Sequence, residues 1–149
     1  MSDNLYDLLS SGFPADRSRP CFILSDGREV SYGDLERGAA QVAGRLIAYG
    51  VEPGDRVAMQ VEKSIEAVMI YLGVLKAGAV FLPLNSAYTP SEIEYFIKDA
   101  EPRVFVTDAV KFAADARTAQ PLKAAVPRAA GDLAAILYTS GTTGRSKGA

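Results

Sequence analysis

Histidine is absent from the 149 residues, and Cys21 is the single cysteine. A lone cysteine cannot form an internal disulfide. Without histidine, the usual zinc sites and the serine–histidine–aspartate triads are excluded within these residues. Cys21 falls in a predicted strand with no cation beside it in the sequence, so we expect a small core residue and not a nucleophile. This cysteine usage favours a reducing, cytoplasmic location.

The chain also lacks a dominant charge and a long apolar run. Sixteen Lys and Arg residues stand against eighteen Asp and Glu residues, which gives a formal net charge of −2. Neither sign forms a block, so we expect no nucleic-acid partner. The most apolar stretch, residues 67–75, is too short to span a bilayer, and the N-terminus does not resemble a secretion signal, so we expect no membrane partner. With 48% apolar residues, the chain can form one packed domain.

The hydrophobic pattern switches between a strand-like and a helix-like period, which is typical of α/β proteins. Residues 21–24 and 28–30 are short extended runs around Asp26-Gly27, a dipeptide suited to a tight turn, so a β-hairpin is predicted. Ser31 and Asp34 then form an acidic capping box. Apolar residues recur every three or four positions from there to Gly50, which predicts an amphipathic helix.

Three strands and two helices are predicted to alternate in the middle of the chain. The strands are residues 56–61, 79–84 and 103–107, and the last two are expected to be buried. Ser64 caps a helix with little charge over 65–75, so this helix must be covered on nearly every side. The other helix begins at Thr89-Pro90 and ends before Pro102. Such short connections predict an α/β fold with a βαβαβ parallel sheet flanked by helices.

Residues 108–131 are rich in alanine and have one short helical pattern, at 110–117, so we predict a connector there. Residues 133–138 resume an apolar run, which predicts a further buried strand. Two methionines and three tyrosines are spaced as core residues of strands and helices. They are Met59, Met69, Tyr71, Tyr88 and Tyr95.

The predicted strand leads directly into TSGTTGRSKG, residues 139–148, with three glycines, five hydroxyls, two cations and no carboxylate. Glycines allow successive backbone N–H groups to point into one concavity, hydroxyls add donors, and Lys147 supplies a mobile positive charge. Such a loop suits a polyanion. The spacing of Gly141, Gly144 and Lys147 matches neither common nucleotide-binding fingerprint.

A flexible Gly/Ser/Thr tail is the alternative, and composition alone favours it. Two observations favour a binding loop. The first is its place at the carboxyl end of a predicted buried strand, where open α/β sheets bind ligands. The second is a resemblance to a known family. Arg145 keeps two interpretations, a contact of this loop or a solvated charge.

The string YTSGTTGRSKG closely resembles the phosphate loop of the AMP-forming, or adenylate-forming, synthetase superfamily, which includes acyl-CoA synthetases, luciferases and the adenylation domains of peptide synthetases. VSYGDLERGAAQVAGRL, GDRVAMQVEKS and LGVLKAGAVFLPLNSAYTPSEIEYFIKDAEP are also similar to family segments, so the resemblance covers most of the chain. EKS, PLNSAYT and GRSKG look most like malonyl-CoA synthetases. Ser146 departs from the general family pattern, in which GxPKG is commoner.

The resemblance implies that residues 1–149 are the N-terminal portion of the large, AMP-binding domain of an acyl-CoA synthetase. It implies a carboxylate–CoA ligase that activates malonate or methylmalonate with ATP to an acyl-adenylate and transfers the acyl group to coenzyme A, with Mg²⁺ as cofactor. The implied phosphate-binding residues are Thr139, Ser140, Gly141, Thr142, Thr143, Gly144 and Lys147. It assigns no catalytic residue and no metal ligand within the chain.

Two other functions stay open: an adenylation domain that loads a carrier protein, and a non-catalytic α/β module with a flexible tail. Members of the superfamily are several-fold longer, so the adenine contacts, the magnesium carboxylate, the acyl pocket and the catalytic lysine are expected beyond Ala149. The connector at 108–131 is also shorter than the family implies. We therefore expect the chain alone to be inactive, and to be poorly soluble or oligomeric because a sheet edge is exposed.

Overall fold

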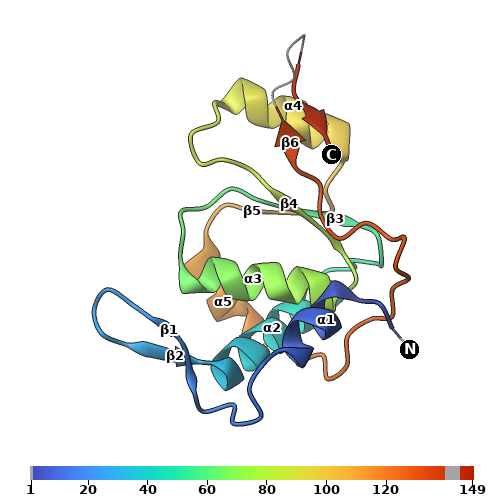
Figure 1. Cartoon of the computed structure of the whole chain (residues 1–149). Coiled ribbons are helices and arrows are strands. Elements are labelled where there is room, and N and C mark those ends of the chain that lie inside the picture. The colour runs from blue at the N-terminus through green and yellow to red at the C-terminus, as the bar shows by residue number, and fades with distance from the viewer. Residues whose placement is uncertain (1, 140–144) are drawn as a thin grey trace.

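The structure is a computed structural model that describes residues 2–139 and 145–149. Its helices are α1 (Leu5–Ser11), α2 (Tyr32–Ala48), α3 (Ile65–Lys76), α4 (Pro90–Ala100) and α5 (Ala109–Ala116). Its strands are β1 (Pro20–Ile23), β2 (Glu29–Ser31), β3 (Arg56–Met59), β4 (Val80–Pro83), β5 (Val104–Val106), β6 (Tyr138–Thr139) and β7 (Lys147–Gly148). Figure 1 shows α4 on one side of the central strands, with α3 and α5 on the other side. None of the helices in the described ranges is long and apolar enough to cross a bilayer.

The N-terminal hairpin and the first long helix agree with the sequence pattern. β1 and β2 pair antiparallel around Gly27, whose φ of 85° needs a residue without a Cβ. At the start of α2, Ser31 accepts a hydrogen bond from the Asp34 backbone N–H, and the Asp34 carboxylate accepts one from the Ser31 N–H. The predicted capping box is therefore confirmed.

The predicted βαβαβ unit is also confirmed, with β3, β4 and β5 forming one parallel sheet in the order β4-β3-β5. Val57 lies opposite Phe81 on one side and Val104 on the other, so the central strand is paired along both edges. α3 and α4 connect these strands in sequence. Because parallel strands need a crossover, the short connections in the sequence were sufficient to predict this arrangement.

The two faces of the sheet have separate cores. On one face, Val57 and Phe81 pack in a cluster with Ile70 of α3 and Leu46 of α2. On the opposite face, Ala58 and Leu82 pack against Phe96 and Ala100 of α4. Alternate residues of a strand point to opposite faces, so β3 and β4 must be apolar at successive positions. α4 thus packs along β3 and β4: Leu84, just after β4, belongs to the same cluster, and the Arg56 side chain at the start of β3 donates to the Ala100 carbonyl at 2.8 Å.

Every residue of α3 is buried or half-buried, as its near lack of charge predicts. One side packs on the sheet, and the other packs against α1 and α2 through Leu72 and Leu75. Lys76, in the last turn, is only 6% exposed and places its Nζ 4.5 Å from the centre of the Tyr6 ring. Burial is the main cause that lowers the pKa of Lys76.

The predicted strand at 103–107 is present as β5, but its predicted burial is wrong at one residue, and the predicted buried strand at 133–138 is wrong. β5 is an edge strand in which Phe105 is 37% exposed and Val106 is buried. Phe105 pairs with Ala58 on the face that α4 covers, but this cover does not reach the edge strand. A run of apolar letters does not reveal whether a strand is central or at an edge.

Residues 133–138 likewise do not form a buried strand. They touch the free edge of β4 at one parallel bridge, between Phe81 and Ala135, while Leu133 is 60% and Leu137 53% exposed. The chain then leaves the sheet, and Leu137 exchanges backbone hydrogen bonds with Ala149 at 2.8 and 2.9 Å. The pairing of Leu137 with Ala149 depends on a distant part of the chain, so the local apolar pattern does not predict it.

The predicted connector contains α5 and then docks on the helices. The Leu122 N–H donates to the Ala40 carbonyl and the Val126 N–H donates to the Lys76 carbonyl, each at 2.9 Å. In addition, the buried Asn4 side chain donates to the carbonyls of Leu75 and Val126 at 2.9 and 2.8 Å. These bonds hold the connector against α2 and the end of α3.

Burial of Tyr6 predicts a loss of stability at alkaline pH. Desolvation is the main cause that raises the pKa of Tyr6 from 10.0 to about 12, and the Glu36 and Asp7 carboxylates add to it. Below pH 10 the phenol is neutral in both states, so its contribution is unchanged. As the pH rises from 10 to 12, the unfolded state loses the proton first and the folded state becomes less favoured.

We expect Tyr6→Phe to lose less stability than the unchanged chain between neutral pH and pH 11, as measured by urea unfolding. Lys76 is present in both chains, so its own titration largely cancels in the comparison. Equal losses in the two chains would show that Tyr6 does not titrate in this range.

Candidate phosphate-binding site

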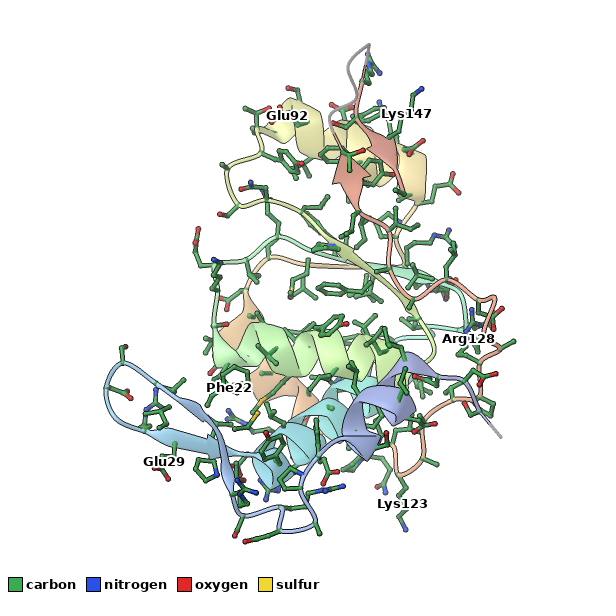
Figure 2. The ribbon with its side chains drawn as sticks, in the orientation of Figure 1. Phe22, Glu29, Glu92, Lys123, Arg128 and Lys147 are labelled. Carbon is green, nitrogen blue, oxygen red and sulfur yellow. The ribbon has the colours of Figure 1, made fainter. Side chains whose placement is uncertain are left out.

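The β6–β7 hairpin contains both ends of the predicted phosphate loop. Thr139 in β6 and Lys147 in β7 are partners across the hairpin, and both are exposed. Figure 2 shows the Lys147 side chain extending from the hairpin beside α4. The remaining predicted residues lie outside the described residues; they are Ser140, Gly141, Thr142, Thr143 and Gly144. The structure thus brings together the two predicted residues that it describes.

Residues just before β7 rest on a tyrosine of α4. The Tyr95 hydroxyl donates a hydrogen bond of 2.8 Å to the Ser146 carbonyl. The Arg145 guanidinium lies 5.2 Å from the centre of the same ring, within cation–π distance. Arg145 remains exposed, so it is a solvated charge that is also stacked on Tyr95.

The other side of the hairpin contacts α4 one turn further along. The Tyr138 hydroxyl donates to the Asp99 carboxylate at 2.6 Å, and the Tyr138 ring lies 4.5 Å from the Phe96 ring, centre to centre. Burial, followed by the hydrogen bond to Asp99, raises the pKa of Tyr138 above its usual range. Tyr138 therefore keeps its proton and remains a donor at any physiological pH.

A cleft of about 570 Å³ lies between α4 and the residues before β7. Its walls carry both charges and aromatic rings. They are formed by Tyr88, Ser91, Glu92, Glu94, Tyr95, Phe96, Lys98, Arg145 and Ser146. Tyr88 and Tyr95 were predicted as core residues. Their rings do pack on Phe96, but both also line this cleft, a role that the apolar spacing in the sequence does not indicate.

The charges of the hairpin fit a phosphate chain better than they fit a metal ion. Residues 133–149 include Arg145 and Lys147 and no Asp or Glu. The carboxylate of Asp99, which contacts the hairpin, already accepts a hydrogen bond from Tyr138. Within residues 2–139 and 145–149, no three acidic or cysteine side chains are grouped closely enough to hold a metal.

The sequence profile of a family described as AMP-binding enzyme matches residues 13–149. The chain belongs to this family of AMP-binding enzymes. The match includes both strands of the hairpin and all seven predicted phosphate-binding positions. Membership of the adenylate-forming superfamily, predicted from YTSGTTGRSKG, is thus confirmed.

Solved structures of this family have the same fold as the chain. Apo MatB from Rhodopseudomonas palustris superposes with a TM-score of 0.91, and its ATP-bound form with 0.90. Each is 42% identical to this sequence and is matched over 100% of this chain and 34% of the longer one. The chain therefore corresponds to the N-terminal part of an adenylate-forming enzyme, as predicted.

Curated relatives include large peptide synthetases. Tyrocidine synthase 1 of Brevibacillus parabrevis is 34% identical over 85% of this chain, and CymA of Salinispora arenicola, a probable non-canonical nonribosomal peptide synthetase, is 35% identical over 95%. The chain covers 13% of the first protein and 2% of the second. It thus spans about a third of MatB and a small part of these relatives.

Proposed function

We propose that the protein containing this chain is an ATP-dependent, AMP-forming carboxylate–CoA ligase that acts on malonate or methylmalonate. The carboxylate attacks the α-phosphate of ATP, pyrophosphate leaves, and the acyl group then passes from AMP to the thiol of coenzyme A. The observation that carries the proposal is the 42% identity with MatB over the whole chain. The identity of this chain is lower with two CoA ligases for aromatic acids: 23% with the anthranilate CoA ligase AuaEII and 22% with a benzoate CoA ligase from Burkholderia xenovorans. EKS, PLNSAYT and GRSKG support the same choice of substrate.

In this proposal the hairpin binds the β- and γ-phosphates. A carboxylate that approaches triphosphate is repelled, and negative charge grows on the pyrophosphate as it leaves. Fixed hydrogen-bond donors reduce the repulsion and stabilise the growing charge, and they need no reorganisation during the reaction. Thr139, Ser140, Thr142 and Thr143 would donate through hydroxyls, Gly141 and Gly144 through backbone N–H groups, and Lys147 through its ammonium group. Mg²⁺ would neutralise further charge, with ligands from outside the described residues.

A cytoplasmic location belongs to the same proposal. Cys21 is free and half-buried in β1, where it packs beside the cluster formed by Tyr6, Val30 and Leu35. A chain with one unpaired cysteine suits a reducing compartment.

Pyrophosphate exchange tests the proposal directly. The protein that contains this chain is incubated with ATP and labelled pyrophosphate, together with malonate, methylmalonate, acetate or a set of amino acids. We expect exchange with malonate or methylmalonate to exceed exchange with the other acids. Absence of exchange with every dicarboxylate would remove the proposed substrate.

Loading of a carrier protein is the second candidate, and the peptide synthetases among the relatives favour it. The two candidates differ in the thiol that accepts the acyl group. Mass spectrometry after addition of coenzyme A or of a carrier protein bearing phosphopantetheine separates them. A ligase forms free acyl-CoA, whereas a carrier-loading domain forms the acylated carrier and exchanges pyrophosphate with an amino acid or another carrier substrate.

A further inference from the structure

We propose that Tyr95 and Asp99 of α4 are positioning residues that hold the two sides of the β6–β7 hairpin in place. The inference rests on the proposed function, because it gives α4 the task of orienting the segment that binds phosphate. Neither side chain needs to touch ATP for this role. Each acts through a hairpin residue, Ser146 or Tyr138.

The spacing of the two residues suits this task. Positions four apart on a helix lie on the same face, so Tyr95 and Asp99 point toward the hairpin together. Asp99 accepts from Tyr138, which precedes residues 140–144, and Tyr95 donates to Ser146, which follows them. The two bonds therefore fix the chain on both sides of the predicted loop.

α4 is itself well anchored and can transmit the rigidity of the sheet. Thr89 and Glu92 form a reciprocal capping box at its start, and Phe96 and Ala100 are buried against β3 and β4. The Phe96 ring also lies 4.5 Å from the Tyr138 ring and 5.5 Å from the Tyr95 ring, centre to centre. Phe96 thus joins the sheet core to both anchoring tyrosines.

The hairpin needs such support because it is small. Its strands are two residues long, and isolated two-stranded hairpins are at best marginally stable in water. Arg145 adds a third link, since its guanidinium stacks on Tyr95. Without α4, the direction of Lys147 and of the loop would be set by a few backbone hydrogen bonds alone.

A substitution in the chain itself tests the mechanical part of the inference. Tyr95→Phe removes the hydroxyl but keeps the ring under Arg145, and Tyr138→Phe removes the bond to Asp99. We expect amide hydrogen exchange of the hairpin to become about fivefold faster in either variant, while exchange in β1 and β2 is unchanged. Tyr49→Phe is the matched control, because the Tyr49 hydroxyl bonds Asp115 in the same way beside α2, far from the hairpin in sequence. Hairpin exchange that stays unchanged, or that rises equally in Tyr49→Phe, overturns the inference.

Kinetics test the functional part, in a chimera in which residues 1–149 replace the matching third of R. palustris MatB. We expect Tyr95→Phe and Asp99→Leu each to lower kcat/KM for ATP about fivefold and to leave KM for the carboxylate unchanged. Asp99→Asn keeps an acceptor for Tyr138 and should restore most of the loss. Equal effects on both substrates, or no rescue by Asn, would indicate a merely structural role and overturn the inference.

The two experiments also separate this inference from the proposed function. If no carboxylate supports pyrophosphate exchange, the proposed ligase activity fails. Faster amide hydrogen exchange of the hairpin in Tyr95→Phe would still show that α4 holds the hairpin. If malonate supports pyrophosphate exchange but Tyr95→Phe and Asp99→Leu leave kcat/KM for ATP unchanged, the ligase proposal stands and the positioning role fails.

Discussion

Replacing Lys147 with Ala is expected to lower kcat/KM for ATP about 100-fold in the chimera or in the protein that contains this chain. Lys147 is exposed in β7, opposite Thr139, at the end of an acid-free segment. An ammonium group at that place has no carboxylate partner within residues 133–149 to compete with a phosphate. Its charge is worth most as pyrophosphate forms, so kcat should fall along with kcat/KM.

Two comparisons show whether the loss belongs to this charge. Lys147→Arg keeps the charge but changes its shape, so we expect a smaller loss than with Ala. Lys123→Ala removes an exposed lysine on the connector, well away from the hairpin in Figure 2, and should change kcat/KM by less than about twofold. Similar losses of kcat/KM in Lys147→Ala and Lys123→Ala would mean that the overall charge of the protein, and not the position of Lys147 in the hairpin, determines kcat/KM for ATP.

Local chemistry made most of the fold predictable. The caps at Ser31, Ser64 and Thr89 are specified by residues within one helical turn, and the structure confirms all three. The parallel sheet followed from three apolar runs joined by short helical segments. The caps and the parallel sheet could be predicted because each depends on neighbouring residues or on the order of the segments along the chain.

The errors fall where burial depends on distant parts of the chain. Residues 133–138 have the composition of a strand, yet Leu133 and Leu137 are exposed, and the pairing partner of the segment changes from Phe81 to Ala149. In the same way, Phe105 is partly exposed because β5 is an edge strand. Strand order and strand partners are set by contacts across the whole fold.

The loop of the candidate site was predicted from the sequence, but the contacts of α4 that hold it were not. Glycines, hydroxyls and a lysine in one short run indicate a loop for phosphate, but nothing local links that run to a helix some 40 residues earlier in the sequence. The spacing of Tyr95 and Asp99 was visible, with both on one helix face. Their common purpose appears only when the hairpin is seen beside α4 (Figure 1).

Replacing Gly73 with Ala is expected to lower the free energy of unfolding by about 2–3 kcal/mol. Gly73 lies in α3 where it meets α2, and a Cβ built there would lie 2.4 Å from Val42 Cγ1 and 2.5 Å from Val42 Cβ. Alanine should stabilise the helix itself by up to about 1 kcal/mol. The clash should exceed this gain because Val42 is β-branched and fully buried, so it has little freedom to turn away.

Gly38→Ala is the matched control, since it adds the same Cβ on the partner helix of the same interface. There the new Cβ would meet Met69, at 2.5 Å from Sδ and 2.7 Å from Cγ, and a methionine side chain can change rotamer. We therefore expect a change of no more than about 1 kcal/mol for Gly38→Ala in urea unfolding, against the larger loss for Gly73→Ala. If both variants lose the same free energy, the rigidity of Val42 is not what limits the approach of α2 to α3, and the packing of the whole helix pair must yield more easily than its close contacts suggest.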